Sequence, residues 1–532
     1  MRGRNFCFIT TPIFYVNAAP HIGHLYSAVI ADAYHRLKRL DGYGHTIFST
    51  GTDEHGTKIQ DAAKKNKQTL KDYCDGMSLC YRTTFEKFNV GFTDYIRTTD
   101  ERHKKAVHHF WDCIKSKGHI YQGKYAGWYC ISEEAFLSEG QLTEKPGPDG
   151  KLQKVSAETG HPVEWTEEEN FMFRLSSFQN DLLYWLKDDH IVQPLKFHKQ
   201  LVSWIQDDSL MQDISISRSK ERVHWGIPVP DNSDQTIYVW LEALVNYLSV
   251  VGYPDNQFQR FWPPDVQVIG KDILKFHGIY WPAFLMAAGL DPPRTLFCHS
   301  HWTVNQEKMS KSKNNIVDPN DMLQTYGSNG FRYFLLREGT PHSDANFSAT
   351  KVKNILNSEL ADSLGNLLNR CCSHAVNPKQ IFPLYNQDSF AKYCESDAKK
   401  LISHLTSLPD AVKQHFEAFN FYKGIDAIIA SIHEANKFFE YQKPWVLAKS
   451  SATSDHLEIV LHVTMETLRV CGILLQPIVP ELSNILLSKL NIPSSQRMWC
   501  HIKPLSWEQA GERHLFSISE APAVLYQRMQ KK

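Results

Sequence analysis

FCFITTPIFYVNAAPHIGH, residues 6–24, is the stretch that decides the fold of this chain. Its first part, Phe6 to Val16, is apolar and rich in β-branched and aromatic residues, which is typical of a buried parallel strand. A helix is predicted next, from about Ile22 to Leu40, because apolar residues recur there at helical spacing. A second strand is predicted at His45 to Ser49. Strand, helix and strand in this order indicate an α/β fold that opens with a doubly wound, nucleotide-binding sheet.

The composition is that of an ordinary globular protein of several domains. With 532 residues the chain exceeds what one hydrophobic core usually supports. Lys plus Arg and Asp plus Glu both number 58, so any RNA contact must come from a local patch and not from net charge. The 11 cysteines form no C-x-x-C pair, which favours free thiols in a reducing compartment. We expect no membrane span, because no run of ~18 apolar residues is present, and no targeting segment before the first strand.

The pattern changes twice along the rest of the chain. Residues from about 115 to 235 contain a Gly/Pro loop and an acidic cluster, and we interpret them as an insertion between two halves of the sheet. Alternating α/β signals return at Thr236 to Leu241 and at Val266 to Gly270. From about 350 to 490 the pattern is helical almost throughout, which predicts a C-terminal helix bundle. The last ~35 residues show no pattern that predicts a structure.

A phosphate site is predicted where the first strand meets the first helix. In an open α/β sheet, ligands bind at that carboxyl edge, and a helix N-terminus attracts phosphate. His21 and His24 are three residues apart and can share one face of the helix. Gly23 lets a ligand approach the backbone closely. Two histidines in a loop are more often structural, but their position at the sheet edge favours a functional role.

A second stretch, Lys308-Met-Ser-Lys-Ser312, carries two lysines at i and i+3 with small hydroxyl residues between them. Such a loop can act as a mobile cationic clamp on phosphate. Taken alone, the simpler interpretation is a solvated charged loop. Its occurrence after His21-Ile-Gly-His24, in this order, favours the phosphate-binding interpretation.

These two stretches resemble the paired signatures of class I aminoacyl-tRNA synthetases. Four more are similar to methionyl-tRNA synthetases in particular: TTPIFYVN (10–17), TGTDEHG (50–56), YVWLEA (238–243) and IGKDI (269–273). The resemblance covers about residues 6 to 450, and six ordered motifs are very unlikely to coincide by chance. It implies a class I Rossmann-type catalytic domain with an inserted connective-peptide subdomain and an all-α C-terminal anticodon-binding bundle.

The expected domain bounds follow from the resemblance and the change of pattern. They are the two catalytic halves at 1–114 and 236–300, the connective-peptide insertion at 115–235, the KMSKS loop and stem-contact region at 301–350, the anticodon-binding domain at 351–495 and a C-terminal tail at 496–532. One position departs from the family, which usually has glycine where this chain has Asn314. Asn tolerates positive φ well, so we expect the turn to survive. A second phosphate-like outline, from Gly118 to Tyr125, ends in tyrosine where Ser or Thr should bind Mg²⁺, and we interpret it as accidental.

The resemblance implies that the methionine carboxylate attacks the α-phosphate of Mg²⁺–ATP to give methionyl-adenylate, which is then esterified onto tRNA(Met). Catalysis would consist of positioning and charge stabilisation at the phosphoryl centre. The residues implied as catalytic are His21, His24, Lys308 and Lys311. Those implied for ATP binding are His21, Gly23, His24, Gly270, Asp272, Lys308 and Lys311.

The family's methionine pocket corresponds to Ile13, Tyr15, Asp53, Trp240, Ala243, Leu244, Tyr247, Ile273 and His277. Asp53 would pair with the substrate ammonium group, and aromatic rings suit a polarizable thioether. Tyr247 and His277 would offer a hydrogen bond to the sulfur. Each apolar member, taken alone, is explained as core. The insertion, about 120 residues, is too short for the editing domain of synthetases for small aliphatic substrates, which disfavours valine, isoleucine and leucine.

The resemblance also assigns anticodon binding to Asn366, Arg370 and Trp445. Asn366 and Arg370 are spaced i, i+4 on a predicted helix and can reach base edges. Trp445 follows a proline, where its ring can stay exposed as a stacking platform for the CAU bases. The alternative is structural: Asn366 caps a helix, Arg370 pairs with an acid and Trp445 packs in the bundle.

Several expectations concern metal, compartment and rival functions. Zinc-bearing relatives have cysteine knuckles where this chain reads Cys130, Glu133, Ser156 and Thr159, so we expect no structural zinc and a buried Cys130. The sequence is most similar to the mitochondrial branch, which implies the mitochondrial matrix, and a monomer is expected. One rival is a cysteinyl-type synthetase, disfavoured because the pocket has Trp240 and no cysteine cluster. The other is an RNA-binding module on an inactive synthetase fold, disfavoured by the intact signatures.

Overall fold

The predicted strand–helix–strand unit forms the centre of a six-stranded parallel sheet. The computed structural model describes residues 6–130, 135–137, 139–147, 151–157, 159–309, 315–502, 516–520 and 524–530. In spatial order the strands are β3 (Asp94–Arg97), β2 (His45–Asp53), β1 (Phe6–Tyr15), β14 (Val266–Gly270), β15 (Leu296–His299) and β9 (Val192–Gln193). From β1 the chain winds outward through β2 to β3, and from β14 it winds in the other direction to β15, beyond which β9, earlier in the sequence, forms the edge. Ligand sites form at the carboxyl ends of strands at such a switch point.

Most elements predicted for the N-terminal unit are confirmed. The helix α1 (Ile22–Leu40) has the predicted bounds, and β2 continues past Ser49 to Asp53. The Gly118–Tyr125 outline lies largely in the strand β4 (Ile120–Cys130), whose extended backbone is no phosphate cradle. The second half of the sheet differs in one detail: β13 (Asn232–Ile237) ends early and the helix α7 (Val239–Leu244) follows at once. A short apolar run suits a buried helix as well as a buried strand, so its pattern could not separate them.

Among the described residues, the range predicted as the insertion supplies strands to four sheets, of which one is the central sheet and one consists of β11 (Ser217–Ser219), β13 and β12 (Pro228–Val229). It forms a separate sheet in the order β10 (Ile214–Ser215), β8 (Glu164–Phe173), β4 and β5 (Ala135–Leu137), with a hairpin of β6 (Leu142–Pro146) and β7 (Leu152–Ser156). It also supplies β9, which pairs with β15 at the edge of the central sheet. The helices α5 (Gln179–Trp185) and α6 (Leu195–Ile205) lie in the same range. The range 115–235 therefore forms sheets of its own and also supplies the edge strand of the central sheet.

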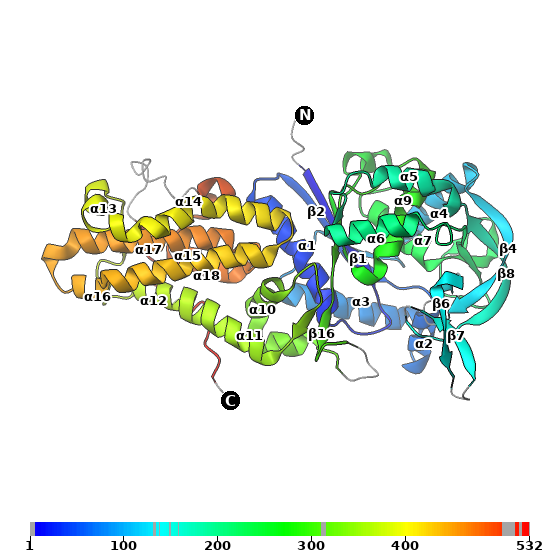
Figure 1. The fold of residues 1–532 in the computed structure, drawn as a ribbon, viewed down its shortest axis with the longest axis horizontal. Helices are drawn as coiled ribbons and strands as arrows, with labels where there is room; N and C mark the ends of the chain where they lie inside the picture. The colour runs from blue at the N-terminus through cyan, green and yellow to red at the C-terminus, as the bar shows by residue number, and fades with distance from the viewer. Residues whose placement is uncertain are drawn as a thin grey trace.

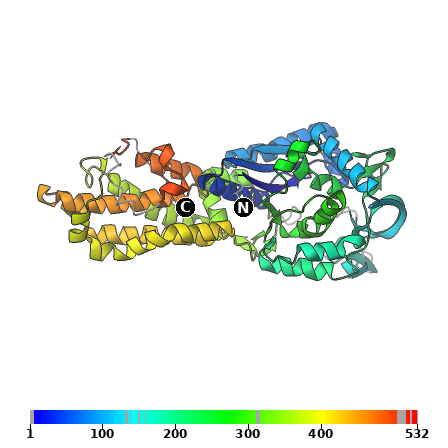
Figure 2. The same ribbon diagram turned by 90° about the horizontal axis from the view of Figure 1, so that it is seen from above.

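A helix bundle occupies the opposite end of the elongated molecule (Figures 1 and 2). Its long helices are α14 (Glu395–Glu417), α15 (Phe421–Gln442), α17 (Ser454–Leu474) and α18 (Pro480–Lys489). The chain enters it from α10 (Pro319–Glu338) through α11 (Ala349–Ile355), the π-helix η7 (Leu356–Gly365) and α12 (Asn366–Cys372). This confirms the predicted α/β catalytic part and all-α C-terminal bundle.

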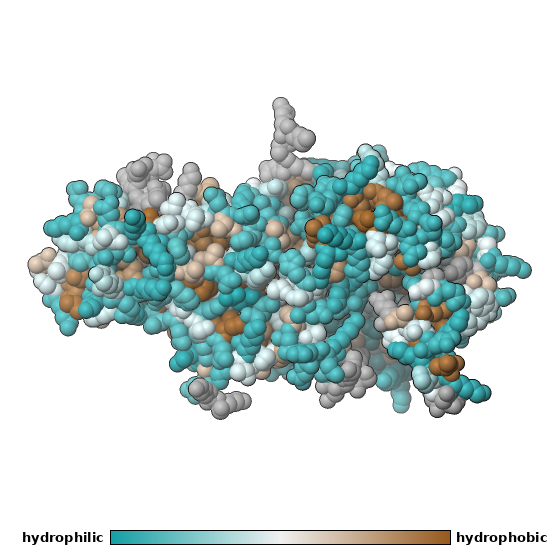
Figure 3. Space-filling model, in the orientation of Figure 1, coloured by the Kyte–Doolittle hydropathy of each residue, from teal (hydrophilic) through white to brown (hydrophobic). Residues whose placement is uncertain are grey.

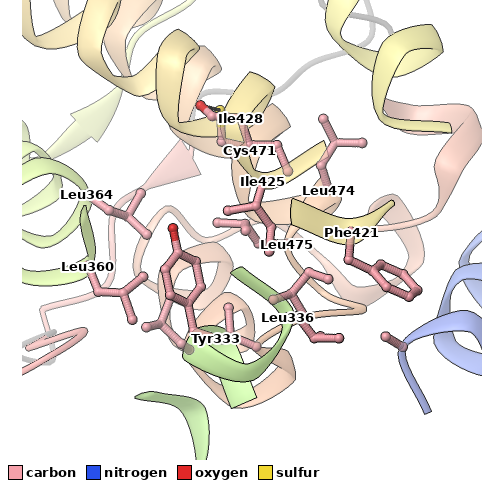
Figure 4. Packing of buried hydrophobic residues seen from close by; sticks show 14 of the residues in the cluster. Tyr333, Leu336, Leu360, Leu364, Phe421, Ile425, Ile428, Cys471, Leu474 and Leu475 are labelled. Atoms are coloured by element: carbon pink, nitrogen blue, oxygen red, sulfur yellow. Dashed lines mark hydrogen bonds between the residues drawn. The ribbon is translucent and has the colours of Figure 1, made fainter. Parts of the chain in front are cut away.

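Buried apolar side chains join α10 to the bundle. Figure 4 shows Tyr333 and Leu336 of α10 packed against residues of η7, α15 and α17, including Leu360, Ile425 and Leu474. The C-terminal tail also returns to this joint. The Tyr526 hydroxyl donates a hydrogen bond to the carbonyl of Tyr326 at 3.0 Å. The two halves of the molecule therefore share one core at their junction.

A buried ion pair crosses the same junction. Arg332 of α10 pairs with Asp32 of α1 at 2.6 Å, and both side chains are fully buried. Its guanidinium also donates to the carbonyls of Ile478 and Phe88, at 3.1 and 3.2 Å. Burial would raise the pKa of the Asp32 carboxyl, but the charges of Arg332 and Arg36 hold it below its usual value. Arg332 thus fastens the sheet's first helix to the segment that leads into α18.

The outer surface is mainly hydrophilic on the face drawn in Figure 3, where the hydrophobic residues form small groups. Within the described ranges, every helix is too short or too polar to cross a bilayer.

Arg332→Ala should lower the free energy of unfolding by about 3–5 kcal/mol, because it removes the fully buried guanidinium partner of Asp32 and leaves that buried carboxylate with Arg36 alone. Urea denaturation followed by circular dichroism measures the change. Arg82→Ala is the matched control: it breaks the exposed Arg82–Glu86 pair and should cost less than about 1 kcal/mol. Equal effects of the two variants would contradict the role given to Arg332.

Candidate active site

Two histidines at the N-terminus of α1 are held by the helix cap itself. His21 is the N-cap residue, and its Nδ1 accepts a hydrogen bond from the Gly23 N–H at 3.0 Å. The Nδ1 of His24 accepts from the His21 N–H at 3.1 Å, and the two rings stack 3.9 Å apart. Because Nδ1 is the acceptor in both rings, each neutral imidazole carries its proton on Nε2. The helix end therefore offers two ring N–H donors beside its positive dipole.

Both histidines are held in the neutral form. Burial, with the nearby charges of His301 and Lys308, lowers the pKa of His21 to about 4. Burial and the neighbouring His21 ring lower the pKa of His24 well below its ordinary value. At neutral pH these side chains therefore act as hydrogen-bond donors to an anion, and they do not carry charge.

Gly23 makes room for the stacked rings. A Cβ at this position would lie 2.8 Å from Cε1 of His21, closer than real contacts allow. The sequence assigned Gly23 to close approach of a ligand; the structure shows that the glycine also permits the inward position of the His21 ring.

One cavity of about 380 Å³ joins this helix end to an apolar recess. It is lined by every described residue that the resemblance assigned to ATP or methionine. For ATP these are His21, Gly23, His24, Gly270, Asp272 and Lys308, and for methionine they are Ile13, Tyr15, Asp53, Trp240, Ala243, Leu244, Tyr247, Ile273 and His277. Lys311 and Asn314 lie outside the described residues. The structure therefore brings together residues that are up to 295 positions apart in the chain, from Ile13 to Lys308.

Lys308 lies at the mouth of the cavity, at the end of β17 (Glu307–Lys308). Its ammonium group pairs with Asp272 at 2.6 Å, while its side chain is 70% exposed. His301 approaches the other oxygen of Asp272 at 3.6 Å. An exposed pair of this kind is weak and exchanges readily with a more highly charged partner.

The apolar recess is built on aromatic contacts. The Trp240 ring stacks on Phe276 with centroids 3.6 Å apart. Asp53, the last residue of β2, lines the same cavity as Trp240. A cavity that combines a carboxylate with stacked aromatic rings suits an amino acid with an apolar side chain.

The expected hydrogen bond from Tyr247 or His277 to a substrate sulfur is not available in this arrangement. His277 Nδ1 donates to the carbonyl of Ile273 at 3.0 Å, so its Nε2 must accept. The Tyr247 hydroxyl donates to that Nε2 at 2.7 Å. The Tyr247 hydroxyl proton and the His277 ring proton are therefore both used in hydrogen bonds within the protein. The pair forms part of the cavity wall, where the tyrosine oxygen can only accept a hydrogen bond.

Sequence reasoning missed several cavity-lining residues, among them Ser27, Lys58, His299, Ser300, His301 and Met309. His299 accepts a hydrogen bond from the Ser27 hydroxyl at 2.7 Å and donates to the Ser300 carbonyl at 2.9 Å. It ends β15, a strand next to β14. The rule that ligands bind at the carboxyl edge of parallel strands could have identified it.

The predicted anticodon residues lie in two helices of the bundle: Asn366 and Arg370 in α12, and Trp445 in α16 (Pro444–Leu447). The Arg370 guanidinium lies over the rings of Trp445 and Phe439, at 5.2 and 5.0 Å, and pairs with Glu440. Trp445 is half-buried, and Asn366 is exposed as the first residue of α12. The structural alternative is found in part: Arg370 pairs with an acid and Trp445 packs against the bundle core, but no cap hydrogen bond of Asn366 is present at this helix start.

The architecture and the cavity are matched by known families. The model for "tRNA synthetases class I (M)" matches residues 7–372, and the model for "Anticodon binding domain of methionyl tRNA ligase" matches residues 391–532. The fold and site thus define a class I aminoacyl-tRNA synthetase. The mitochondrial methionine–tRNA ligase of Bos taurus is 48% identical over 504 residues, covering 92% of this chain and 84% of that protein. The Homo sapiens mitochondrial protein is also 48% identical, with the same coverage.

A solved structure agrees with these relatives. Methionyl-tRNA synthetase of Mycobacterium tuberculosis in complex with methionyl-adenylate is 35% identical, with a TM-score of 0.89 over 98% of this chain and 100% of that one. The chain belongs to the methionyl-tRNA synthetase family. Its reaction is the ATP-dependent ligation of methionine to tRNA through methionyl-adenylate.

Acidification from pH 6.5 to pH 4 should destabilise the protein, partly through its buried histidines. Burial lowers the pKa of His21, His35, His277 and His299 to about 4. The unfolded chain, with histidine pKa near 6.5, binds more protons in this window, so stability present above pH 6.5 is lost as pH falls.

The contribution of the His21 ring to this loss of stability can be separated from that of the other groups that bind protons between pH 6.5 and 4. His21→Gln should make the fall in melting temperature between pH 6.5 and 4 shallower, as measured by differential scanning fluorimetry. His190→Gln, at an exposed position, should leave the slope unchanged. A His21→Gln slope equal to that of the wild type would show that this ring is protonated in the folded state.

Proposed function

We propose that the cavity binds methionine and Mg²⁺–ATP side by side and that the residues named above divide the reaction between them. The observation that supports this proposal most strongly is the single cavity that joins the N-terminus of α1 to the recess of Asp53 and Trp240. Two ends of different chemistry, one for an anion and one for an apolar amino acid, suit the two parts of methionyl-adenylate. The domain bounds given above stay a prediction.

At the anionic end, the Nε2–H groups of His21 and His24 donate to the phosphate oxygens of ATP. A methionine carboxylate oxygen forms the new bond to the α-phosphorus, and the bond to the β-phosphate bridging oxygen breaks, so pyrophosphate leaves. The Lys308 ammonium group leaves Asp272 and pairs with the departing pyrophosphate. Lys311 neutralises further charge on the same pyrophosphate. Gly270, the last residue of β14, and Asp272, two residues later, bind the rest of the nucleotide. The protein supplies preorganised charge and no covalent step.

At the apolar end, Asp53 binds the ammonium group and the thioether lies against Trp240, with Ile13, Tyr15, Ala243, Leu244, Tyr247, Ile273 and His277 as further walls. The Tyr247–His277 pair contributes shape, since its protons are already used. Sulfur–aromatic contact then distinguishes methionine from aliphatic side chains of similar length.

For the tRNA, Asn366, Arg370 and Trp445 bind the anticodon. Arg370 and Trp445 already lie in contact, and a planar guanidinium beside an indole suits base stacking. The mitochondrial relatives support a mitochondrial location, with the matrix as the compartment in which tRNA is charged. A monomeric state stays a prediction.

We propose no structural zinc for the insertion. Cys130 is fully buried, as expected, and Ser156 accepts a hydrogen bond from the Thr159 N–H at 3.2 Å. Glu133 lies outside the described residues. One thiolate with two hydroxyl residues is not a tetrahedral zinc set.

His24→Ala and Lys311→Ala should each lower methionine-dependent ATP–pyrophosphate exchange by about 100- to 1,000-fold, because each removes a charge-stabilising group at the phosphoryl centre. Methionine binding, measured by calorimetry, should persist. Lys64→Ala, on the surface helix α2 (Thr57–Lys65), is the control and should exchange normally. Near-wild-type exchange in either active-site variant would overturn the assigned roles.

Trp445→Ala should lower tRNA charging by about 10-fold or more while leaving ATP–pyrophosphate exchange intact, since a stacked base contributes ~1–3 kcal/mol. Tyr184→Ala, at an exposed aromatic residue of α5, should change neither activity. If both activities of Trp445→Ala fall together with the melting temperature, the tryptophan is structural and the anticodon assignment fails.

A further inference from the structure

Behind the apolar recess, a histidine and a glutamate are buried against each other. The Nδ1 of His55 contacts Oε1 of Glu242, and the two side chains are 4% and 0% exposed. Neither residue lines the cavity of the active site. Burying two polar groups of this kind is unfavourable unless they satisfy each other in good geometry.

Each member of the pair lies within two residues of side chains that line the recess. His55 follows Asp53 by two residues, just beyond the end of β2. Glu242 lies in α7 between Trp240 and Ala243. At about 100° per residue, Glu242 lies roughly on the opposite side of α7 from Trp240, so the helix turns one face to the cavity and the other to His55. The pair therefore fastens the strand end that carries Asp53 to the helix that carries Trp240.

The loop after β2 is held from other directions as well. The Trp225 indole N–H donates to the Glu54 carbonyl at 2.6 Å, and the Gly56 N–H donates to the Trp225 carbonyl at 3.0 Å. Arg97 forks onto the Glu54 carboxylate at 2.7 and 2.9 Å. These contacts join the loop to the range 115–235 and to β3. The contact between His55 and Glu242 joins the same loop to α7. Asp53 is thus presented to the cavity from a rigid support.

The glutamate depends on this one partner. Its second oxygen, Oε2, is buried and has no hydrogen-bond partner among the residues that the structure describes. A carboxylate accepts hydrogen bonds only, so the His55 ring must donate from Nδ1. Removal of either group leaves the other buried and unsatisfied, which shifts the backbone that carries it.

We infer that His55 and Glu242 form a positioning pair that sets the affinity for methionine by fixing Asp53 relative to Trp240 and Ala243. This inference rests on the proposed placement of methionine between those residues. The pair touches no substrate. It fixes the distance between the group that binds the ammonium and the wall that binds the thioether, so it governs the fit of the amino acid and leaves the ATP end unchanged.

The test compares two substitutions of Glu242 in ATP–pyrophosphate exchange. Glu242→Leu removes the acceptor and should raise KM for methionine at least 10-fold, with KM for ATP within twofold of the wild type. Glu242→Gln keeps an acceptor for the His55 N–H and should restore KM for methionine to within about threefold. The matched control is Glu466→Leu, which breaks the buried Glu466–Arg469 pair in the bundle. It should lower the melting temperature without changing KM for methionine.

Two further variants separate the outcomes. If Glu242→Leu does not fold, His55→Ala, which removes the donor to Glu242, should give the same selective rise in KM for methionine. Asp53→Asn tests the placement of methionine itself and should also raise that KM. A rise in Asp53→Asn alone, with the pair variants merely less stable, overturns the positioning role and keeps the proposed function. No rise in Asp53→Asn overturns the proposed placement and the inference together.

Discussion

The N-terminus of α1 is the constraint around which the rest of the site is arranged. A helix start leaves backbone N–H groups without partners, and here His21 satisfies one of them while the His21 backbone N–H is satisfied by His24. This reciprocal cap fixes both rings, selects the tautomer of each and leaves their Nε2 protons for a ligand. Gly23 is required because any side chain would displace the His21 ring. The same hydrogen bonds that begin the helix therefore create the anion site.

The same helix also connects the site to the other end of the molecule. Three turns beyond the cap, Asp32 binds Arg332 of α10 in a fully buried pair, and α10 shares a core with η7, α15 and α17 (Figure 4). Separation of this buried pair is costly, since it would leave Arg332 buried without its carboxylate and Asp32 with Arg36 alone. The position of the anticodon-binding bundle is thus defined relative to the catalytic helix by packing and by charge.

Much of the fold and the site could be predicted because the informative features are local. The strand-to-helix junction at residues 6–40 has strong periodicity, and the motifs around His21, Asp53, Trp240 and Gly270 are short and contiguous. The failures concern contacts between distant segments. β9 has two residues, too few for any pattern, yet it completes the central sheet. The use of the Tyr247 and His277 protons depends on the carbonyl of Ile273 and the ring orientation, which a sequence does not specify.

The central claim is that one cavity holds methionine and the adenylate phosphate together. Calorimetric titration with a non-hydrolysable methionyl-adenylate analogue, the sulfamoyl adenosine of methionine, tests this most directly. The account predicts affinity at least about 100-fold above that of methionine alone, a gain of roughly 2.7 kcal/mol, with losses in both Asp53→Asn and His24→Ala. Affinity no greater than that of methionine, or unaffected by one of the two substitutions, would contradict it.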